Sequence, residues 1–487
     1  PFATGVADYD VSLDGHKLLY RTGGGGGGRG GAGGGANLFI VDADRQPPQP
    51  GAGRIDATLR AFIDPKAEFA QIFNEGWRNQ RDYLYVPNTH GSDWPKMRQE
   101  YSQLLPYVRH RADLNYLIDM MGAEIAIGHS YVRGGDMPEV PQATGGQLGA
   151  DFAIENGRYR ITRIYDGESW NPDLRAPLAQ PGLDVRVGDY VLAVNGEDLA
   201  GTDDINRLLD GMANKQVVLT LNAAPTTVGA RHVTVVAIPS DQGLRSRAWI
   251  EHNRRVVDSL SRGQLAYVYL PNTGGPGYTS FNRYYFAQQD RKGAIIDERY
   301  NGGGQAADYI IDVLQRDFDG YFNNVAGDRV PFTSPSAGIW GPKVMIINEM
   351  AGSGGDLMPW MFKYRKIGTL VGKRTWGGLV HTADTPPFID GGSMIAPRGG
   401  FFGRDDKWHV ENEGTPPDID VENWPKDVAA GRDPQLERAV QEALRQLQAH
   451  PVDRAMQEPA PPTWGKRVRP WPWPPAWPIV FEIHLHL

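Results

Sequence analysis

The chain has 487 residues, enough for about three domains, and its content of 40% hydrophobic and 22% charged residues is that of an ordinary globular protein. Its formal net charge of -8 argues against nucleic acid or an anionic membrane as the main partner, because both require concentrated lysine and arginine. The absence of cysteine excludes disulfides, thiolate metal sites and cysteine nucleophiles.

The first 55 residues are predicted to form short strands. Residues 9–21 read as two strands around the turn Leu13-Asp14-Gly15, and residues 37–41 supply a third. The nearly pure glycine tract at 23–35 is interpreted as a flexible connection, because no lysine or helix follows it that would suit a phosphate site. Since three strands alone do not form a stable sheet, we interpret residues 1–55 as the last blade of a β-propeller whose other blades lie outside this chain.

Residues 56–142 are predicted to be a helical subdomain. Asp64 followed by Pro65 is a typical helix start, with an N-cap aspartate and a proline at the first helical position. Apolar residues then repeat at helical spacing, which indicates a packed core rather than a cofactor site. They are Phe69, Ile72, Phe73, Gly76 and Trp77 on the first face, and Leu114, Leu117, Ile118 and Met121 on a later one.

Residues 143–242 change to short strands and glycine turns. The stretch Gly146–Phe152 contains a glycine loop, and Gly188–Gly196 ends in Asn195-Gly196, a typical hairpin turn. A short amphipathic helix is expected at Asp203–Leu209. These pieces, in this order, resemble a PDZ domain, which implies binding of an extended peptide or its C-terminus by strand addition. A spacer domain with a vestigial groove is the alternative.

Residues 243–450 alternate apolar strands with helices, the pattern of an α/β domain. The predicted strands are 265–270, 294–297, 344–347 and 369–371, and the predicted helices include 306–316 and one that begins at Asp433-Pro434.

The remaining residues, 451–487, are rich in proline and tryptophan, which favours an extended polyproline conformation. His484 and His486 alternate with apolar residues there, and we assign them no metal.

One serine stands out in the α/β segment. Ser353 lies in Asn-Glu-Met-Ala-Gly-Ser-Gly-Gly-Asp at 348–356, between the apolar strand that ends at Ile347 and the apolar segment Leu357–Phe362. A serine among glycines at a strand-to-helix turn is approachable, and the first amides of the helix are free to bind developing negative charge. Ser353 is therefore a candidate acyl-transfer nucleophile, although Gly-Ser-Gly is also common in ordinary loops.

Four other stretches can be assembled around this serine. Ile127–Tyr131 places His129 directly after the helical segment, and strand 294–297 leads into a run of glycines that lets backbone amides approach a substrate. The other two are Arg374–Gly378 and Val410–Asp418, which contains Glu411 and Glu413. Taken alone, each has an ordinary explanation, such as a structural histidine, a surface charge or a tight turn. A serine becomes a good nucleophile when a histidine takes its proton and a carboxylate supports the imidazolium.

Together these stretches resemble the tricorn protease branch of the C-terminal processing peptidases. The resemblance covers nearly everything after residue 55, and the strands before it fit as well. It implies a multidomain α+β fold with five parts. These are a β-propeller remnant (1–55), a helical subdomain carrying the catalytic histidine (56–142), a PDZ-like domain (143–242), an α/β peptidase core of ClpP/crotonase-like fold (243–450) and a Pro/Trp-rich tail (451–487).

The resemblance also implies roles for single residues. Ser353 would be the nucleophile, His129 the general base and Glu411 the carboxylate that orients the imidazole. The oxyanion hole would be formed by the amide of Gly354 and by that of Gly302 or Gly303. No cofactor and no metal are implied.

Two positions depart from the family pattern. The family usually carries a serine immediately before the histidine, where its hydroxyl helps to bridge to the glutamate, whereas this chain has Gly128 there. Ser130 follows the histidine and cannot be assumed to replace it, because adjacent side chains point in different directions. The family also uses an acidic residue to favour basic substrates, and rough spacing places Asn324 at that position, which argues against such a preference.

We therefore expect a serine endopeptidase that degrades short peptides or unfolded segments through an acyl-enzyme. The resemblance implies a homo-oligomer, a hexamer, and peptides as partners; we expect no nucleic acid and no membrane, and a cytoplasmic location. The chain opens at Pro1 and looks like a fragment, so a targeting signal could precede it. The alternatives are a non-catalytic PDZ-containing peptide-binding scaffold and an α/β-hydrolase-type esterase, in which His409 would be the base.

Overall fold

The computed structural model describes residues 2–22, 37–46, 51–55, 62–138, 140–168, 170–383, 385–452 and 457–462. The predicted glycine connection and most of the Pro/Trp-rich tail, with His484 and His486, lie outside the described residues. Among the described helices, none is both long enough and apolar enough to cross a bilayer.

The first strands form a small antiparallel sheet in the order β1-β2-β3-β4. Its strands are Val6–Val11, Lys17–Thr22, Asn37–Asp42 and Arg54–Ile55. The three predicted strands are present, and the fourth was missed because it has only two residues. Tyr20 and Phe39 stack with ring centroids 4.8 Å apart and, with Val41, form a small apolar core.

The next segment is helical, as predicted. Its helices are α1 (Pro65–Tyr83), α2 (Trp94–Ser102) and α3 (Arg111–Ala123), followed by the short strand β5 (Tyr131–Arg133). Asp64 caps α1 by accepting hydrogen bonds from the amides of Lys66 and Ala67. The predicted apolar faces of α1 and α3 pack together in one core that includes Ile72, Phe73, Leu114, Ile118 and Met121.

The PDZ-like segment is an antiparallel sheet in the order β11-β10-β8-β7-β6, with β9 paired to β8. The strands are β6 (Ala150–Glu155), β7 (Arg158–Ile164), β8 (Tyr190–Val194), β9 (Glu197–Asp198), β10 (Gln216–Asn222) and β11 (Arg231–Val236). The predicted turn is confirmed, since Asn195 and Gly196 both have positive φ, 52° and 84°. The predicted short helix is α4 (Ile205–Leu209).

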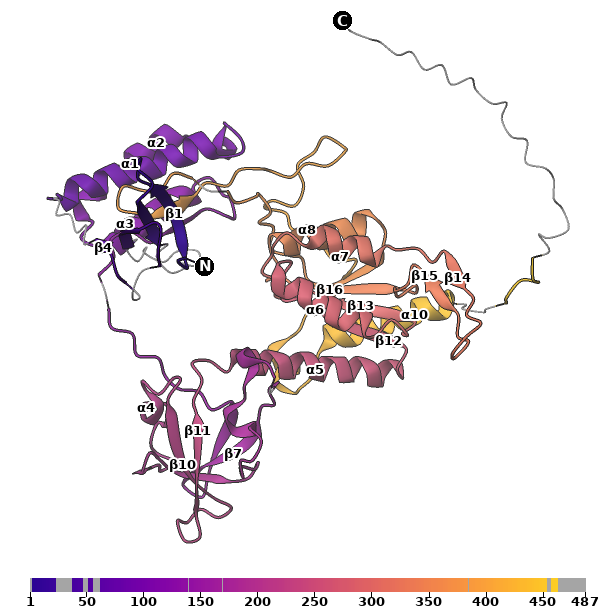
Figure 1. Ribbon diagram of the computed structural model, residues 1–487. Coiled ribbons are helices and arrows are strands. Elements are labelled where there is room, and N and C mark those ends of the chain that lie inside the picture. Colours follow the sequence, from indigo (N-terminus) through magenta and orange to yellow (C-terminus); the bar gives the residue numbers. More distant parts are fainter. Residues whose placement is uncertain are drawn as a thin grey trace, which may run out of the picture.

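The α/β core is a five-stranded parallel sheet in the order β12-β13-β16-β17-β19. Its strands are Leu265–Tyr269, Gly293–Asp297, Lys343–Ile347, Thr369–Gly372 and Ile419–Asp420. One face is covered by α6 (Gly275–Phe286), α7 (Ala307–Leu314) and α8 (Gly354–Tyr364), and the other by α5 (Gln242–Ser261) and α10 (Pro434–Ala449). This three-layer arrangement is visible in Figure 1.

Minor elements complete the chain. A hairpin of β14 (Gly320–Phe322) and β15 (Phe332–Ser334) extends from the core, and α9 (Pro425–Ala429) precedes α10. Single-turn 3₁₀ helices lie at Thr89–Gly91, Leu105–Tyr107, Pro172–Leu174 and Pro177–Ala179.

A long excursion between β17 and β19 joins the core to the helical subdomain, and we call residues 373–416 the bridging segment (Figure 1). Its strand β18 (Ser393–Ile395) pairs antiparallel with β5, and its Phe388 and Met394 pack into the core of α1 and α3. Asp390 forms a buried ion pair with Arg111 of α3 at 2.5 Å. The bridging segment therefore contributes strand, apolar and ionic contacts to a subdomain that is far away in sequence.

Candidate active site

Ser353 occupies the turn between β16 and α8 in a strained backbone conformation, with φ 59° and ψ -116°. A non-glycine residue held in such a region costs on the order of 1–3 kcal/mol and persists only where its surroundings enforce it. Both neighbours must be small, because a Cβ on Gly352 would lie 2.6 Å from Trp376 and one on Gly354 2.1 Å from the Thr273 hydroxyl. The turn thus presents Ser353 at the N-terminus of α8, where backbone amides are available.

Asp356 holds this turn in place. Its fully buried carboxylate accepts hydrogen bonds from the amide of Ser353 (2.8 Å), the hydroxyl of Thr375 (2.5 Å) and the amides of Gly377 (2.8 Å) and Gly378 (3.1 Å). Burial raises the pKa of Asp356, while these hydrogen bonds act in the opposite direction. The carboxylate therefore ties the serine turn to the start of the bridging segment.

The glycine loop after β13 lies directly against the serine. A Cβ on Gly303, whose φ is 80°, would be 2.6 Å from the Ser353 Cβ. The amide of Gly302 donates to the carbonyl of Pro271 (3.1 Å), and the amide of Gly303 donates to Oδ1 of Asn301 (2.9 Å). The two glycine-loop amides that the sequence suggested for an oxyanion hole, those of Gly302 and Gly303, are thus engaged in this structure.

Two other amides at the same place have no hydrogen-bond acceptor among the described residues. They belong to Gly354, which was predicted, and to Gly304, which was not. Gly304 lies against Gly354, since a Cβ on Gly354 would be 2.8 Å from the Gly304 nitrogen. The sequence could not distinguish three consecutive glycines, because which amide stays free depends on the acceptors that fold around the loop.

Two buried side chains beside the glycine loop also keep polar atoms without a partner in the described part of the chain. One is the hydroxyl of Thr273, next to Gly304 and Gly354, and the other is Oε1 of Glu298. Burial, followed by the nearby charge of Asp356, raises the pKa of Glu298 well above its usual range. Leaving a buried polar group unpaired costs about 1–3 kcal/mol, so the site is built at some expense in stability.

His129 is buried in the segment that follows α3, with 8% of its surface exposed. Its ring packs edge-on against Trp376, with centroids 5.5 Å apart. The same indole reaches the serine turn, because a Cβ on Gly352 would be 2.6 Å from it. Trp376 is thus a common neighbour of His129 and of the turn that carries Ser353. The sequence drew attention to its stretch but not to this residue.

Glu411 is fixed by three backbone amides. Its Oε1 accepts from Gly128 (3.0 Å), and its Oε2 accepts from Leu379 (2.7 Å) and Val380 (2.8 Å). The carboxylate is therefore bound to the residue that precedes His129. Glu413, the other candidate, is exposed, and it contacts this turn through its backbone amide, which donates to the carbonyl of Val410. The structure therefore favours Glu411 over Glu413, a choice that the sequence left open.

The backbone around Glu411 is strained on both sides. Val410 is a buried β-branched residue with φ 77°, and Asn412 has φ 61°. The side chain of Asn412 donates to the carbonyl of Ala126 (2.8 Å), which joins this turn to the segment before His129. Strained residues of this kind cluster at functional sites.

The structure gives a local reason for Gly128. A Cβ at this position would be 2.9 Å from the Gly378 Cα and 3.0 Å from the Trp376 ring. Ser130, on the other side of His129, accepts a hydrogen bond from the Gln80 side chain at 2.6 Å. Ser130 is therefore committed to the helical subdomain, and Gly128 makes room for the bridging segment.

Other predicted residues lie apart from this cluster. Asn324 is partly buried in the loop between β14 and β15, and its side chain bonds within that loop, to Asp328 (3.1 Å) and the amide of Ala326 (3.3 Å). His409, the base of the hydrolase alternative, pairs with Asp405 at 2.9 Å and packs on Trp360. In the PDZ-like domain the loop amides of Gly146 and Gln147 are used by internal carbonyls.

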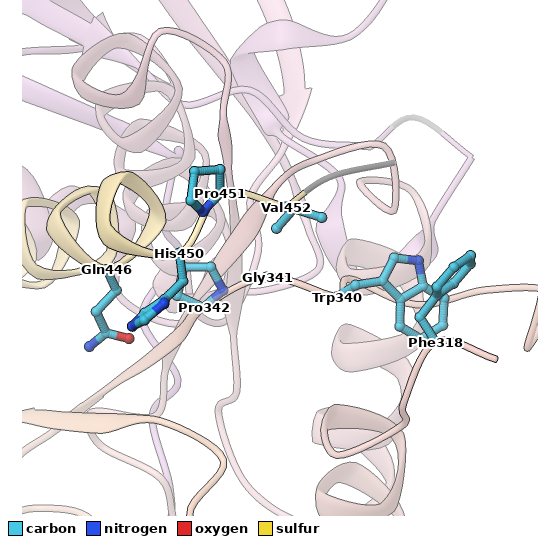
Figure 2. A pocket seen from close by; sticks show the side chains of 8 residues that line it. All are labelled: Phe318, Trp340, Gly341, Pro342, Gln446, His450, Pro451 and Val452. Atoms are coloured by element: carbon cyan, nitrogen blue, oxygen red, sulfur yellow. The ribbon is translucent and has the colours of Figure 1, made fainter. Parts of the chain in front are cut away.

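A hollow of about 410 Å³ lies at the opposite edge of the core sheet and is shown in Figure 2. Gly341 and Pro342, which precede β16, line it together with the end of α10. Ser353, in contrast, follows the carboxyl end of β16, the edge at which α/β proteins usually bind their ligands. Ser353 and this hollow thus lie at opposite ends of the strands of the core sheet.

Comparison with protein families identifies three matching regions. Residues 65–123 match the tricorn protease C1 domain, residues 146–240 the tricorn protease PDZ domain, and residues 264–421 peptidase family S41.

Proteins similar to the chain along most of its length are also named tricorn protease or tricorn protease homolog. The chain is 34% identical over 458 residues to tricorn protease homolog 1 of Streptomyces coelicolor, covering 92% of this chain and 41% of that protein. It is 31% identical to the tricorn protease of Thermoplasma volcanium, covering 92% and 42%. The crystal structure of the tricorn protease superposes with a TM-score of 0.82 at 27% identity, covering 92% of this chain and 42% of that one. The chain therefore spans about two fifths of the length of these relatives.

Proposed function

We propose that the chain, which matches the tricorn protease C1 and PDZ domains and peptidase family S41, is a serine peptidase of the tricorn branch that cleaves peptides through an acyl-enzyme. The observation that carries the proposal is the arrangement around Trp376, which touches both the ring of His129 and the turn of Ser353. Glu411 completes the group through its hydrogen bond to Gly128.

In the proposed reaction the Ser353 oxygen attacks the carbonyl carbon of the peptide bond while His129 takes the hydroxyl proton. The tetrahedral intermediate collapses as the carbon–nitrogen bond breaks, and His129 returns the proton to the leaving amine. A water molecule then hydrolyses the ester in the same way and releases the acid. Glu411 would stabilise the imidazolium formed in each half.

The negative charge of the intermediate would be held by the amide of Gly354 together with one amide of the glycine loop. Gly304 suits this role because its amide lies beside Gly354 and has no acceptor within the described part of the chain. Gly303, which the sequence suggested, would first have to exchange its bond to Asn301, and Gly302 its bond to Pro271.

Further features of the relatives remain proposals for this chain. The four-stranded β1–β4 sheet has the size and antiparallel order of a propeller blade, which supports the propeller assignment. The parallel core supports the ClpP/crotonase-like assignment only in its general layout. Asn324 as a substrate contact, assembly into a homo-hexamer, cytoplasmic location and the domain limits stay predictions.

A fluorophosphonate probe tests the proposal, because it labels an activated serine. We expect an adduct at Ser353 that is lost in His129→Ala, and peptide hydrolysis that falls by about four to six orders of magnitude in Ser353→Ala or His129→Ala. Ser130→Ala serves as the matched control, since this nearby hydroxyl bonds to Gln80.

Two results would overturn it. An unlabelled Ser353 in a folded protein that still binds peptides would favour the peptide-binding scaffold. Loss of labelling in His409→Ala but not in His129→Ala would favour the hydrolase alternative.

A further inference from the structure

A groove of about 1080 Å³ lies between the PDZ-like domain and the core, and one end of it reaches the candidate active site. Its walls come from α5, α6 and the segment that follows β7. Pro271 and Tyr300 line its end at the core. The carbonyl of Pro271 accepts the amide hydrogen of Gly302, so the groove begins at the glycine loop that lies against Ser353.

The size and lining of the groove suit an extended chain rather than a small molecule. Small-ligand pockets usually measure about 300–1000 Å³, and this groove is at the upper limit or beyond it. Flat apolar surfaces dominate its lining, and such surfaces bind aromatic and aliphatic side chains. They are supplied by Trp249, Tyr269, Pro271, Pro276, Tyr284 and Tyr300.

Tyr300, at the end of the groove next to the core, has an unusual backbone conformation. It has φ 65°, which is uncommon for a bulky residue, and 57% of its surface is exposed. Its amide donates to Oδ1 of Asn348, a buried residue at the end of β16, at 2.9 Å. Residues with a strained backbone conformation cluster at ligand-binding and active sites, which fits an exposed aromatic side chain at this place.

The far wall of the groove is anchored by a buried ionic cluster. Glu168, whose side chain is 4% exposed, accepts from Arg283 of α6 at 2.5 Å and from Arg247 of α5 at 3.3 Å. The hydrogen bond from Arg283 is the main reason that the pKa of Glu168 lies below its usual value. The cluster joins the PDZ-like side to the core, so it keeps both walls of the groove in place.

We propose that this groove binds an extended segment of the peptide substrate, beyond the residues next to the scissile bond, and prefers aromatic or aliphatic side chains. The inference rests on the proposed peptidase function and adds a substrate-length dependence to it. Short peptides would occupy only the space around Ser353, whereas longer ones would gain the contacts of Tyr300 and the aromatic walls.

Binding is measured in the Ser353→Ala background so that turnover does not interfere. The probes are a fluorescein-labelled peptide rich in phenylalanine and leucine and long enough to leave the glycine loop, and a labelled tetrapeptide with the same central sequence. In fluorescence anisotropy, Tyr300→Ala should weaken binding of the long peptide by about tenfold and leave the tetrapeptide within about twofold. Thr279→Trp, an exposed position of α6 that lines the groove, should cause the same selective loss by filling it.

The matched control is Tyr278→Ala, because this α6 tyrosine is 47% exposed and does not line the groove. The proposal is overturned if Tyr300→Ala and Thr279→Trp leave the long peptide unaffected, or if they weaken both peptides equally. The two proposals can fail separately. A wild-type protein that binds the long peptide through Tyr300 but never cleaves it would refute the peptidase and support the groove.

Discussion

The serine and the histidine of the candidate site are positioned in two different ways. Ser353 is held within one domain, by a strand, a helix and the buried Asp356 that binds its amide. His129 belongs to the helical subdomain, and its contacts to the serine turn pass through the bridging segment, by Trp376 and Glu411. Regular secondary structure therefore positions the nucleophile, Ser353. The base, His129, is positioned by contacts with the irregular bridging segment, which is distant in sequence.

Among substitutions that leave Ser353 and His129 in place, the largest effect is expected from Glu411→Gln, which changes the base side of the site and keeps the size of the side chain. The amide group loses the charge that supports an imidazolium and cannot accept all three backbone hydrogens. We expect kcat/KM for peptide hydrolysis to fall by about 10²–10⁴-fold. The control is Glu413→Gln, which should stay within about twofold; equal losses in the two variants would contradict the assignment.

The nucleophile side is tested by Asp356→Asn. The amide nitrogen would face buried N–H donors, so at least one of the hydrogen bonds from Ser353, Thr375, Gly377 and Gly378 is lost. We expect the free energy of unfolding in urea to fall by about 2–3 kcal/mol. Asp312→Asn removes an exposed ion pair with Arg365 and should change it by less than about 1 kcal/mol. Similar values for both would mean that Asp356 is not a structural anchor.

Gly128→Ser asks whether the family's usual residue can be restored. The added Cβ would press on the Cα of Gly378 and on Trp376, and the bridging backbone cannot move cheaply. We expect kcat/KM to decrease by about tenfold, a loss of about 1.4 kcal/mol, rather than to rise. Gly145→Ser, with its nearest neighbour at 3.8 Å, is the control for an added serine side chain. A gain in activity would show that the serine helps even in this setting.

The smallest effect concerns acid. Burial acts to raise the pKa of Asp390, but hydrogen bonds from Arg111 and from the amides of Asp136 and Gly392 outweigh it and leave the pKa below its ordinary value. The ion pair therefore stabilises docking fully above the ordinary pKa, and this contribution is lost as the pH falls below about 4. Hydrogen exchange should then speed up in β5 and β18 before it does in β16. In Asp390→Asn that pH dependence should disappear; exchange that rises equally in all three strands would contradict the prediction.

Much of the fold could be predicted because local signals were strong. Asp64 and Asp433 each cap the helix that they were expected to start, and Asn195-Gly196 forms its turn. The predicted apolar runs correspond to the strands β12, β13, β16 and β17 of the core. The pairing of β5 with β18 could not be predicted, since both strands have three residues and are separated by most of the chain.

The site was predictable in residue type more than in detail. The turn of Ser353 follows from a strand, glycines and a helix in succession, which sequence displays directly. The free amide of Gly304, the pairing of Glu411 with Gly128 and the position of Trp376 depend on contacts made across the fold. The strain at Val410 was also invisible, because valine usually avoids positive φ and nothing nearby marks it as an exception.

The bridging segment also has a consequence for the order in which the protein is made. Ribosomes synthesise the helical subdomain first and the serine turn later, while Trp376 and Glu411 emerge only after both. A growing chain that already contains His129 and Ser353 thus lacks the residues that join them. On the proposed function, a chain that has been translated only as far as Ser353 would be inactive. It could not cleave other nascent proteins until Trp376 and Glu411 had also been synthesised and folded into place.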